Sequence, residues 1–215
     1  MKSKIVVTHW VHAETIERLS GSGRVVTNET RETWPREQLM REVTDATALM
    51  AFMPDAVDAA FLSAAPKLKM IACALKGFDN FDLAACEKAG VMVSIVPDLL
   101  TEPTAELAIG LAIGVGRQLR AGDTLVRSGE FKGWRPVLYG MGLNGATVAI
   151  VGFGAVGRAI AAKLPAFGAT VIAVDPRAAP YDGVEFLPLK SALARADFVI
   201  MAAPLTPDTR HIINA

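Results

Sequence analysis

The 215-residue sequence has few cysteines, no excess of either charge and no long apolar run, and each shortage excludes a class of protein. Its two cysteines, Cys73 and Cys86, are too few for a disulfide framework and indicate reduced thiols in a cytoplasmic protein. Twenty-two basic and 22 acidic residues cancel, so nucleic acid and anionic membranes are not expected partners. The longest strongly apolar stretch, residues 107–116, has about half the length that crosses a bilayer, so no membrane span is predicted.

Strands and helices alternate along the first hundred residues. Buried strands are predicted for the apolar runs at 4–10, 48–54, 69–75 and 91–96, and helical spacing occurs at 13–23, 35–46, 57–66 and 82–90. This alternation predicts an α/β fold with parallel sheet order. Residues 96–122 then form one predicted helix rich in Ala, Gly and Leu, which is expected to join two lobes, 1–98 and 99–215.

The second lobe opens with the most specific motif of the chain. The stretch "ATVAIVGFGAVGRAIAAKLPAFGATVIAVDPR" predicts a strand, a glycine-rich turn, a helix and a second strand that ends at Asp175. In the turn, Gly152 allows the tight bend, Gly154 lets a pyrophosphate reach the backbone, and Gly157 lets helix and strand pack closely. The start of the helix offers free N–H groups to the phosphates. A dinucleotide site is therefore predicted; the alternative is a glycine-rich turn without a ligand.

The residues around this turn also indicate which dinucleotide is bound. Asp175 is placed to accept hydrogen bonds from the adenosine ribose and would repel the 2′-phosphate of NADP, which favours NAD. Arg177 would pair with that phosphate, so NADP stays a weaker alternative. The predicted cofactor contacts also include Ala155 and Val156 in the turn and the hydroxyl of Thr104 near the start of the long helix. No metal site is predicted, because no cluster of residues has ligand spacing.

Several stretches together resemble one family. The segments "MAFMPD", "ALKGFDNFD", "VPDLLTEPTAELAIGL", "RSGEFKGWRPVLYG" and "VGFGAVG" are similar to the D-isomer-specific 2-hydroxyacid dehydrogenases. Within that family, Lys76 in "LKGFDNFD" and the segment "GWRPVLYG" resemble the phosphonate (phosphite) dehydrogenases. The resemblance implies a flavodoxin-like substrate lobe, a Rossmann lobe that binds NAD, and a homodimer built on the cofactor lobe.

The resemblance also implies roles for individual residues. Lys76, beside Gly77, is expected to hold the oxyanion of the substrate, and Met53 is expected near it. Trp134 and Tyr139 are expected to close over the substrate pocket, with structural packing as the alternative. The loop after "ADFVIMAAP" is expected to pass beneath the cofactor, which makes Ala203 and Pro204 cofactor contacts.

The resemblance places the catalytic arginine, glutamate and histidine in the C-terminal half of the family. This chain ends at "PLTPDTRHIINA", so we expect an enzyme whose Rossmann lobe is incomplete at its C-terminus. The first hypothesis is NAD-dependent oxidation of phosphite to phosphate by hydride transfer. The second is a D-2-hydroxyacid dehydrogenase in which Lys76 holds a carboxylate. The third is a non-catalytic dinucleotide-binding fragment.

Overall fold

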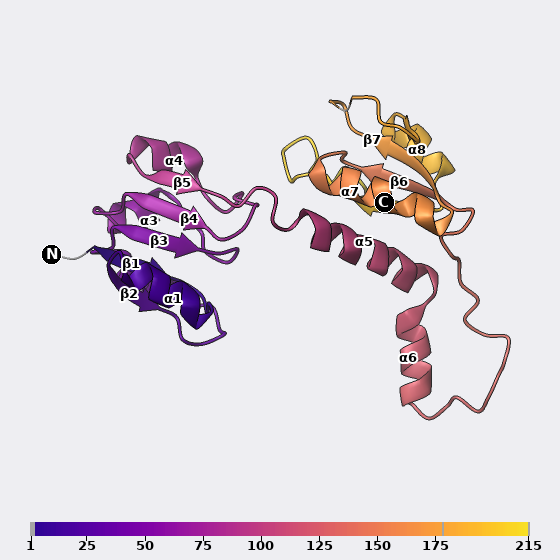
Figure 1. Cartoon of the computed structure of the whole chain (residues 1–215), viewed down its shortest axis with the longest axis horizontal. Helices are drawn as coiled ribbons and strands as arrows, with labels where there is room; N and C mark the ends of the chain where they lie inside the picture. Colours follow the sequence, from indigo (N-terminus) through magenta and orange to yellow (C-terminus); the bar gives the residue numbers. More distant parts are fainter. Residues whose placement is uncertain (1–2, 178, 215) are drawn as a thin grey trace. The chain divides into compact units, whose positions relative to one another are not determined.

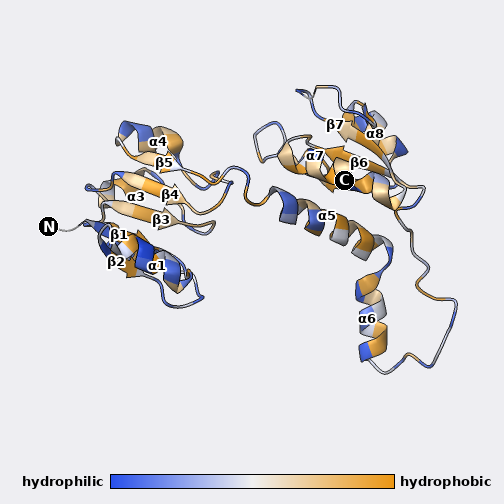
Figure 2. Cartoon of the chain, in the orientation of Figure 1, coloured by the Kyte–Doolittle hydropathy of each residue, from blue (hydrophilic) through white to orange (hydrophobic). Residues whose placement is uncertain are grey.

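The computed structural model describes residues 3–177 and 179–214, and the chain divides into two compact units, Met1–Asp98 and Leu99–Ala215 (Figure 1). Each unit is built on its own parallel sheet. An α/β fold of two parallel sheets is what the alternation of strand and helix patterns predicts. Apolar residues are concentrated on the strands, whereas α1 (Ala13–Ser20) is largely hydrophilic (Figure 2).

Unit 1 contains five strands in the order β2-β1-β3-β4-β5, all parallel. The strands are β1 (Lys4–Val7), β2 (Arg24–Thr27), β3 (Ala48–Ala51), β4 (Met70–Cys73) and β5 (Met92–Ser94). Besides α1, the helices are α2 (Arg36–Val43), α3 (Ala59–Ala64) and α4 (Leu83–Lys88). Val6, Leu49 and Ile71 from the three central strands pack with Val43 and Phe61 from the helices, so the core lies between the sheet and α2 and α3.

Two aspartates begin the short helices of unit 1. The side chain of Asp58 accepts a hydrogen bond from the N–H of Phe61 at the start of α3, and Asp82 accepts one from Ala85 at the start of α4. Each carboxylate satisfies a backbone donor that the helix itself leaves free, which fixes where the helix begins. The loops that precede these helices, which carry predicted site residues, are therefore anchored at their ends.

Unit 2 contains four strands in the order β8-β7-β6-β9, again all parallel. The strands are β6 (Thr147–Val151), β7 (Thr170–Val174), β8 (Val184–Phe186) and β9 (Phe198–Met201). The helices are α5 (Thr101–Gly116), α6 (Leu119–Arg127), α7 (Ala155–Lys163), the 3₁₀ helix η1 (Leu164–Phe167) and α8 (Leu189–Arg195).

Both faces of the sheet of unit 2 are covered by helices. Val148 and Ile150 of β6 share one core cluster with residues of α5 and α7, including Ile160. Ala149, on the opposite face of the same strand, packs in a second cluster with Ala192 of α8. Because successive side chains of a strand point to opposite faces, a strand buried on both faces reads as a continuous apolar run. That explains the unbroken "TVAIV" of β6.

The prediction of one long helix over residues 96–122 is wrong in two respects. The helix begins only at Thr101, and it ends at Gly116; α6 then begins at Leu119 after Gln118, whose φ of 52° lies in the left-handed region. The amide nitrogen Nε2 of Gln118 donates to the carbonyl oxygen of Tyr139 at 2.7 Å, and Gly116 lies against the backbone of Met141. Contacts with a segment more than twenty residues away therefore accompany the break.

Candidate functional site

The glycine turn between β6 and α7 is held by the strands on either side of it. Gly152 has a φ of 96°, and its N–H donates to the carbonyl oxygen of Val174 at 2.8 Å. A side chain at Gly152 would overlap the backbone of Ala203 in the loop after β9. Only glycine fits both the backbone conformation and this close approach. The predicted contacts Gly152 and Ala203 are thus brought together, and Pro204 follows in the same loop.

The start of α7 is shaped to receive an anion. A Cβ at Gly157 would overlap the carbonyl oxygen of Gly152, so the helix packs directly on the turn. Gly154 is the N-cap, makes no side-chain cap hydrogen bond, and has open space where a Cβ would lie. The backbone N–H groups at the start of the helix, at Ala155 and Val156, therefore meet no capping side chain, which is the arrangement that binds phosphate groups.

Asp175, directly after β7, is tied to the same turn. Its Oδ2 accepts from the N–H of Phe153 at 2.9 Å, and its Oδ1 accepts from the N–H of Arg177 at 2.8 Å. The N–H groups of Arg177 and Phe153 hold the pKa of the Asp175 carboxyl below its usual value. Each carboxylate oxygen keeps a second lone pair, so the ionised side chain still accepts hydrogen bonds from ribose hydroxyls.

In unit 1 the predicted substrate residues lie in two loops, after β3 and after β4. The side chain of Lys76 is 47% exposed, and its Nζ lies 3.9 Å from Oδ1 of Asp98. Gly77, beside it, accepts a hydrogen bond from the Cys73 thiol at 3.4 Å. Met53, in the first loop, is 59% exposed. An exposed ammonium beside a glycine backbone is suited to a small anion.

Three further predicted residues lie on the surface of unit 2. Trp134 is 84% exposed and Tyr139 is 77% exposed, both in the irregular segment between α6 and β6. Thr104 lies exposed in the first turns of α5, and its N–H donates to the carbonyl oxygen of Leu100. Their contacts with substrate and cofactor stay predictions.

Comparison with known families shows to which family a chain with this site belongs. The model of the D-isomer specific 2-hydroxyacid dehydrogenase, NAD binding domain, matches residues 109–215. Over 223 aligned residues the chain is 36% identical to a glyoxylate reductase of Thermococcus onnurineus, covering 100% of this chain and 67% of that protein. The chain belongs to the D-isomer specific 2-hydroxyacid dehydrogenases. The cofactor of this dehydrogenase is NAD, and the turn at Gly152–Gly157 together with the carboxylate of Asp175 fits it.

Other relatives support the same family for this dehydrogenase. A glyoxylate reductase of Thermococcus litoralis is 35% identical over 100% of this chain and 67% of its own length. A putative D-isomer specific 2-hydroxyacid dehydrogenase from Polaromonas has a TM-score of 0.88 at 28% identity, over 97% of this chain and 67% of that one. A glyoxylate reductase from Paecilomyes thermophila has a TM-score of 0.83, also at 28% identity, over 99% of this chain and 68% of that one.

These comparisons confirm the predicted family and fold. The chain spans about two thirds of the length of the curated relatives named above. Those relatives carry the name glyoxylate reductase and not that of the phosphonate dehydrogenases, which Lys76 and the segment "GWRPVLYG" resemble. The hydroxyacid alternative is therefore better supported than phosphite.

The residues that the structure describes form neither a metal site nor a membrane-spanning helix. Within residues 3–177 and 179–214, no group of three or more His, Cys, Asp or Glu is placed to hold a metal ion. In the same described ranges, every helix is too short or too polar to cross a membrane.

Two residues that were not predicted as site residues, Asp55 and Asn80, make hydrogen bonds to the backbone of the loop that carries Met53. The sequence signals for them are that each is polar, follows a predicted buried strand, and lies in one of the segments quoted for the family resemblance, "MAFMPD" and "ALKGFDNFD".

Proposed function

We propose that the whole protein is an NAD-dependent oxidoreductase that interconverts a small 2-hydroxy acid and the corresponding 2-oxo acid, of which glyoxylate is one. In oxidation, a hydride leaves C2 of the hydroxy acid for the nicotinamide, and the hydroxyl proton leaves to a base. The similarity of the entire chain to proteins named glyoxylate reductase carries this proposal. The glycine turn and Asp175 bind the dinucleotide, and Lys76 holds the substrate carboxylate.

Phosphite is the second candidate, and Lys76 is the observation that favours it. Phosphite is doubly charged near neutral pH and lacks a carbon skeleton, so its binding depends on positive charge more than the binding of a hydroxy acid does. In that reaction phosphite, water and NAD⁺ give phosphate, NADH and a proton, with hydride leaving phosphorus. Among the residues that the structure describes, the only ion pair of the Lys76 ammonium is with Asp98, at 3.9 Å, and the lysine side chain is half exposed. It is therefore accessible to such an anion.

The two candidates are separated by steady-state kinetics of the whole protein. Glyoxylate with NADH, and D-glycerate, D-lactate and phosphite with NAD, are assayed side by side. The first proposal expects a kcat/KM for a hydroxy or oxo acid above that for phosphite, and the reverse order supports phosphite. Lys76→Met should lower kcat/KM for the anion, whereas Lys69→Met, an exposed lysine at the opposite end of β4, should not. No turnover of any of the four anions would refute both candidates.

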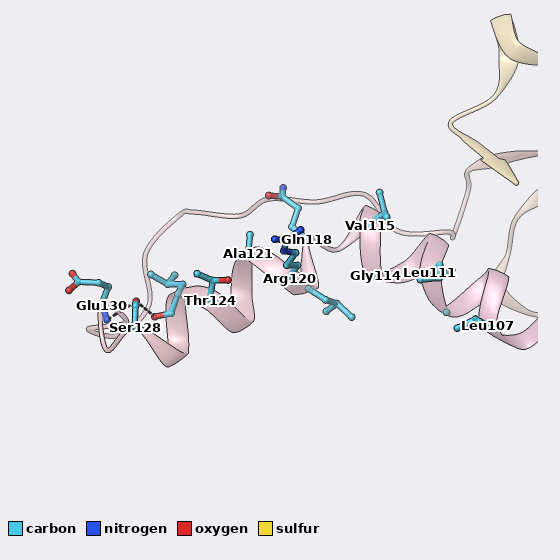
Figure 3. A pocket seen from close by; sticks show the side chains of 13 residues that line it. Leu107, Leu111, Gly114, Val115, Gln118, Arg120, Ala121, Thr124, Ser128 and Glu130 are labelled. Carbon is cyan, nitrogen blue, oxygen red and sulfur yellow. Dashed lines mark hydrogen bonds between the residues drawn. The ribbon is translucent and has the colours of Figure 1, made fainter. Parts of the chain in front are cut away.

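We also propose that the protein is a homodimer and that a second copy covers an apolar face of α5 and α6. Leu107, Leu111 and Val115 repeat every four residues along α5 and are all exposed. They border a hollow of about 1080 Å³ that continues onto α6 (Figure 3). Gly114 also lines this hollow. A stripe with this repeat complements a second copy of itself around a two-fold axis.

The dimer is tested by sedimentation of the whole protein over a range of concentrations. Leu111→Glu should shift the mass from two chains to one, because it places a charge in the centre of the apolar face. Leu193→Glu, an exposed leucine of α8, is the matched control and should leave the mass unchanged. A wild-type protein that sediments as one chain at every concentration would refute the proposal. The same result is expected if another part of the protein, and not a second copy, covers this face.

A further inference from the structure

Two loops of unit 1 leave the same edge of its sheet. β3 and β4 are parallel neighbours, with Ala51 paired to Cys73 at their ends, so residues 52–56 and 74–80 emerge side by side. The first loop exposes Met53 and the second exposes Lys76. Because these are the residues proposed to meet the substrate anion, the spacing between the loops sets the geometry of that site. This inference rests on the proposed function.

The first loop is folded around a buried carboxylate. Asp55 is only 4% exposed, and its Oδ2 accepts from the N–H of Phe52 at 2.7 Å and from the hydroxyl of Thr8 at 2.5 Å. The ring of His9 packs edge-on against the ring of Phe52, with centroids 5.3 Å apart. Thr8 and His9 directly follow β1, which is the other neighbour of β3 in the sheet. Their contacts therefore tie the first loop to the end of β1 and restrict its movement.

The second loop is joined to the first by one side chain, that of Asn80. Its Nδ2 donates to the carbonyl oxygens of Asp55 at 2.6 Å and of Phe52 at 3.2 Å. The backbone continues the connection, because the N–H of Val57 donates to the carbonyl oxygen of Asn80 at 3.0 Å. In the described part of unit 1, no other side chain is hydrogen-bonded between the two loops. The Oδ1 of Asn80 is buried without a donor, so the amide serves through its N–H groups.

We propose that Asn80 is a positioning residue that sets the distance between Met53 and Lys76 and thereby the affinity for the substrate anion. Asn80 acts through the carbonyl groups of Phe52 and Asp55 and does not itself contact the substrate. Without its amide, the two carbonyl groups lose a shared donor, and of the hydrogen bonds described above only the one from the Val57 N–H to the Asn80 carbonyl oxygen still joins the second loop to the first. A misplacement of about 1 Å in a substrate-positioning group costs up to about 100-fold in rate.

The test compares Asn80→Ala with Asn28→Ala in the whole protein. Asn28 is a matched control, because its Nδ2 also bridges two backbone carbonyl oxygens, of Thr8 at 3.0 Å and of Glu32 at 2.8 Å. Its side chain is hydrogen-bonded to neither substrate loop. Both variants should be less stable to urea. Only Asn80→Ala should raise the KM for the anion, about tenfold or more, while the KM for NAD stays within about twofold.

Amide hydrogen exchange supplies a readout that does not need turnover. Asn80→Ala should speed exchange in residues 52–56 and 74–80 together, and Asn28→Ala should not. If Asn80→Ala does not fold, Asn80→Ser is judged by the same criteria, because it keeps one donor. An unchanged KM for the anion, with stability lost as in Asn28→Ala, overturns the inference and leaves the proposed function standing. A wild-type protein that turns over none of the anions overturns the proposed function, and the inference with it.

Discussion

Replacing Asp175 with Asn is the sharpest test of how this dehydrogenase selects its cofactor. The carboxylate lies at the end of β7 and accepts hydrogen bonds from Phe153 and Arg177, both from backbone N–H groups. Asn has the same size but no charge, so the repulsion toward a 2′-phosphate disappears while the guanidinium of Arg177 remains. A pair of partly solvated charges is worth on the order of 1 kcal/mol, which is about tenfold in a ratio of rate constants.

The assay measures kcat/KM for NAD and for NADP in the same preparations. We expect the NADP to NAD ratio to rise about tenfold in Asp175→Asn. The control is Asp182→Asn, which removes the same charge from an exposed position in the segment between β7 and β8 and should leave the ratio unchanged. A ratio that is the same in wild type and Asp175→Asn would refute the reasoning and mean that the ribose is held by another residue.

Comparison with Asp175→Ala separates the charge from the geometry of the turn. Alanine leaves the N–H groups of both Phe153 and Arg177 without their acceptor, whereas asparagine retains one acceptor oxygen. The alanine variant should therefore bind both NAD and NADP more weakly, by about 1–3 kcal/mol for a lost hydrogen bond to a charged group. Equal affinities in the two variants would show that these hydrogen bonds do not shape the cofactor site.

Three further predictions concern stability. Gly157→Ala should lower the free energy of unfolding by about 1–3 kcal/mol, because the new Cβ would overlap the carbonyl oxygen of Gly152. Urea unfolding measures this change. The control is Gly122→Ala on α6, where a Cβ meets open space and should not destabilise the protein. Phe61→Ala should cost about 3–5 kcal/mol because the ring is fully buried, and a loss below about 1 kcal/mol in the same assay would contradict that. The lowered pKa of the Asp175 carboxyl means that its contribution to stability is complete above about pH 4 and is lost as the pH falls through the lowered pKa. Wild type and Asp175→Asn should therefore become more alike in free energy of unfolding as the pH falls below about 4, and a difference that does not shrink over that range would contradict this.

The dinucleotide turn was predictable because its determinants are close together in the sequence. At Gly152 and Gly157 a Cβ would overlap neighbouring backbone, Gly154 leaves the start of α7 open, and Asp175 follows one strand later. The alternation of strand and helix patterns predicted most of the remaining fold for the same reason. β2 and β8 were missed, since both lie at the edge of their sheets and their sequences, "RVVT" and "VEF", contain only two apolar residues each.

What could not be predicted depends on contacts distant in sequence. Gln118 has an adequate helix propensity, and only its hydrogen bond to the Tyr139 carbonyl, with the close packing at Gly116, accompanies the end of α5. Asn80 likewise stands in the same quoted motif as Lys76, but its role appears only when Phe52 and Asp55 are placed beside it. Sequence patterns report requirements that are local in the chain, whereas Gln118 and Asn80 each make hydrogen bonds to a segment that is distant in the sequence.

The position of β9 has a consequence for handling the protein in solution. Its four residues, "FVIM", carry no charge, lie at the edge of the sheet beside β6, and leave Val199 and Met201 exposed. In the described part of the chain, the outer side of this strand offers unpaired N–H and C=O groups, which act as a template for a strand from another molecule. Residues 1–215 expressed alone should therefore aggregate as their concentration rises, and Val199→Lys should improve their solubility by making that edge unfavourable for a second strand.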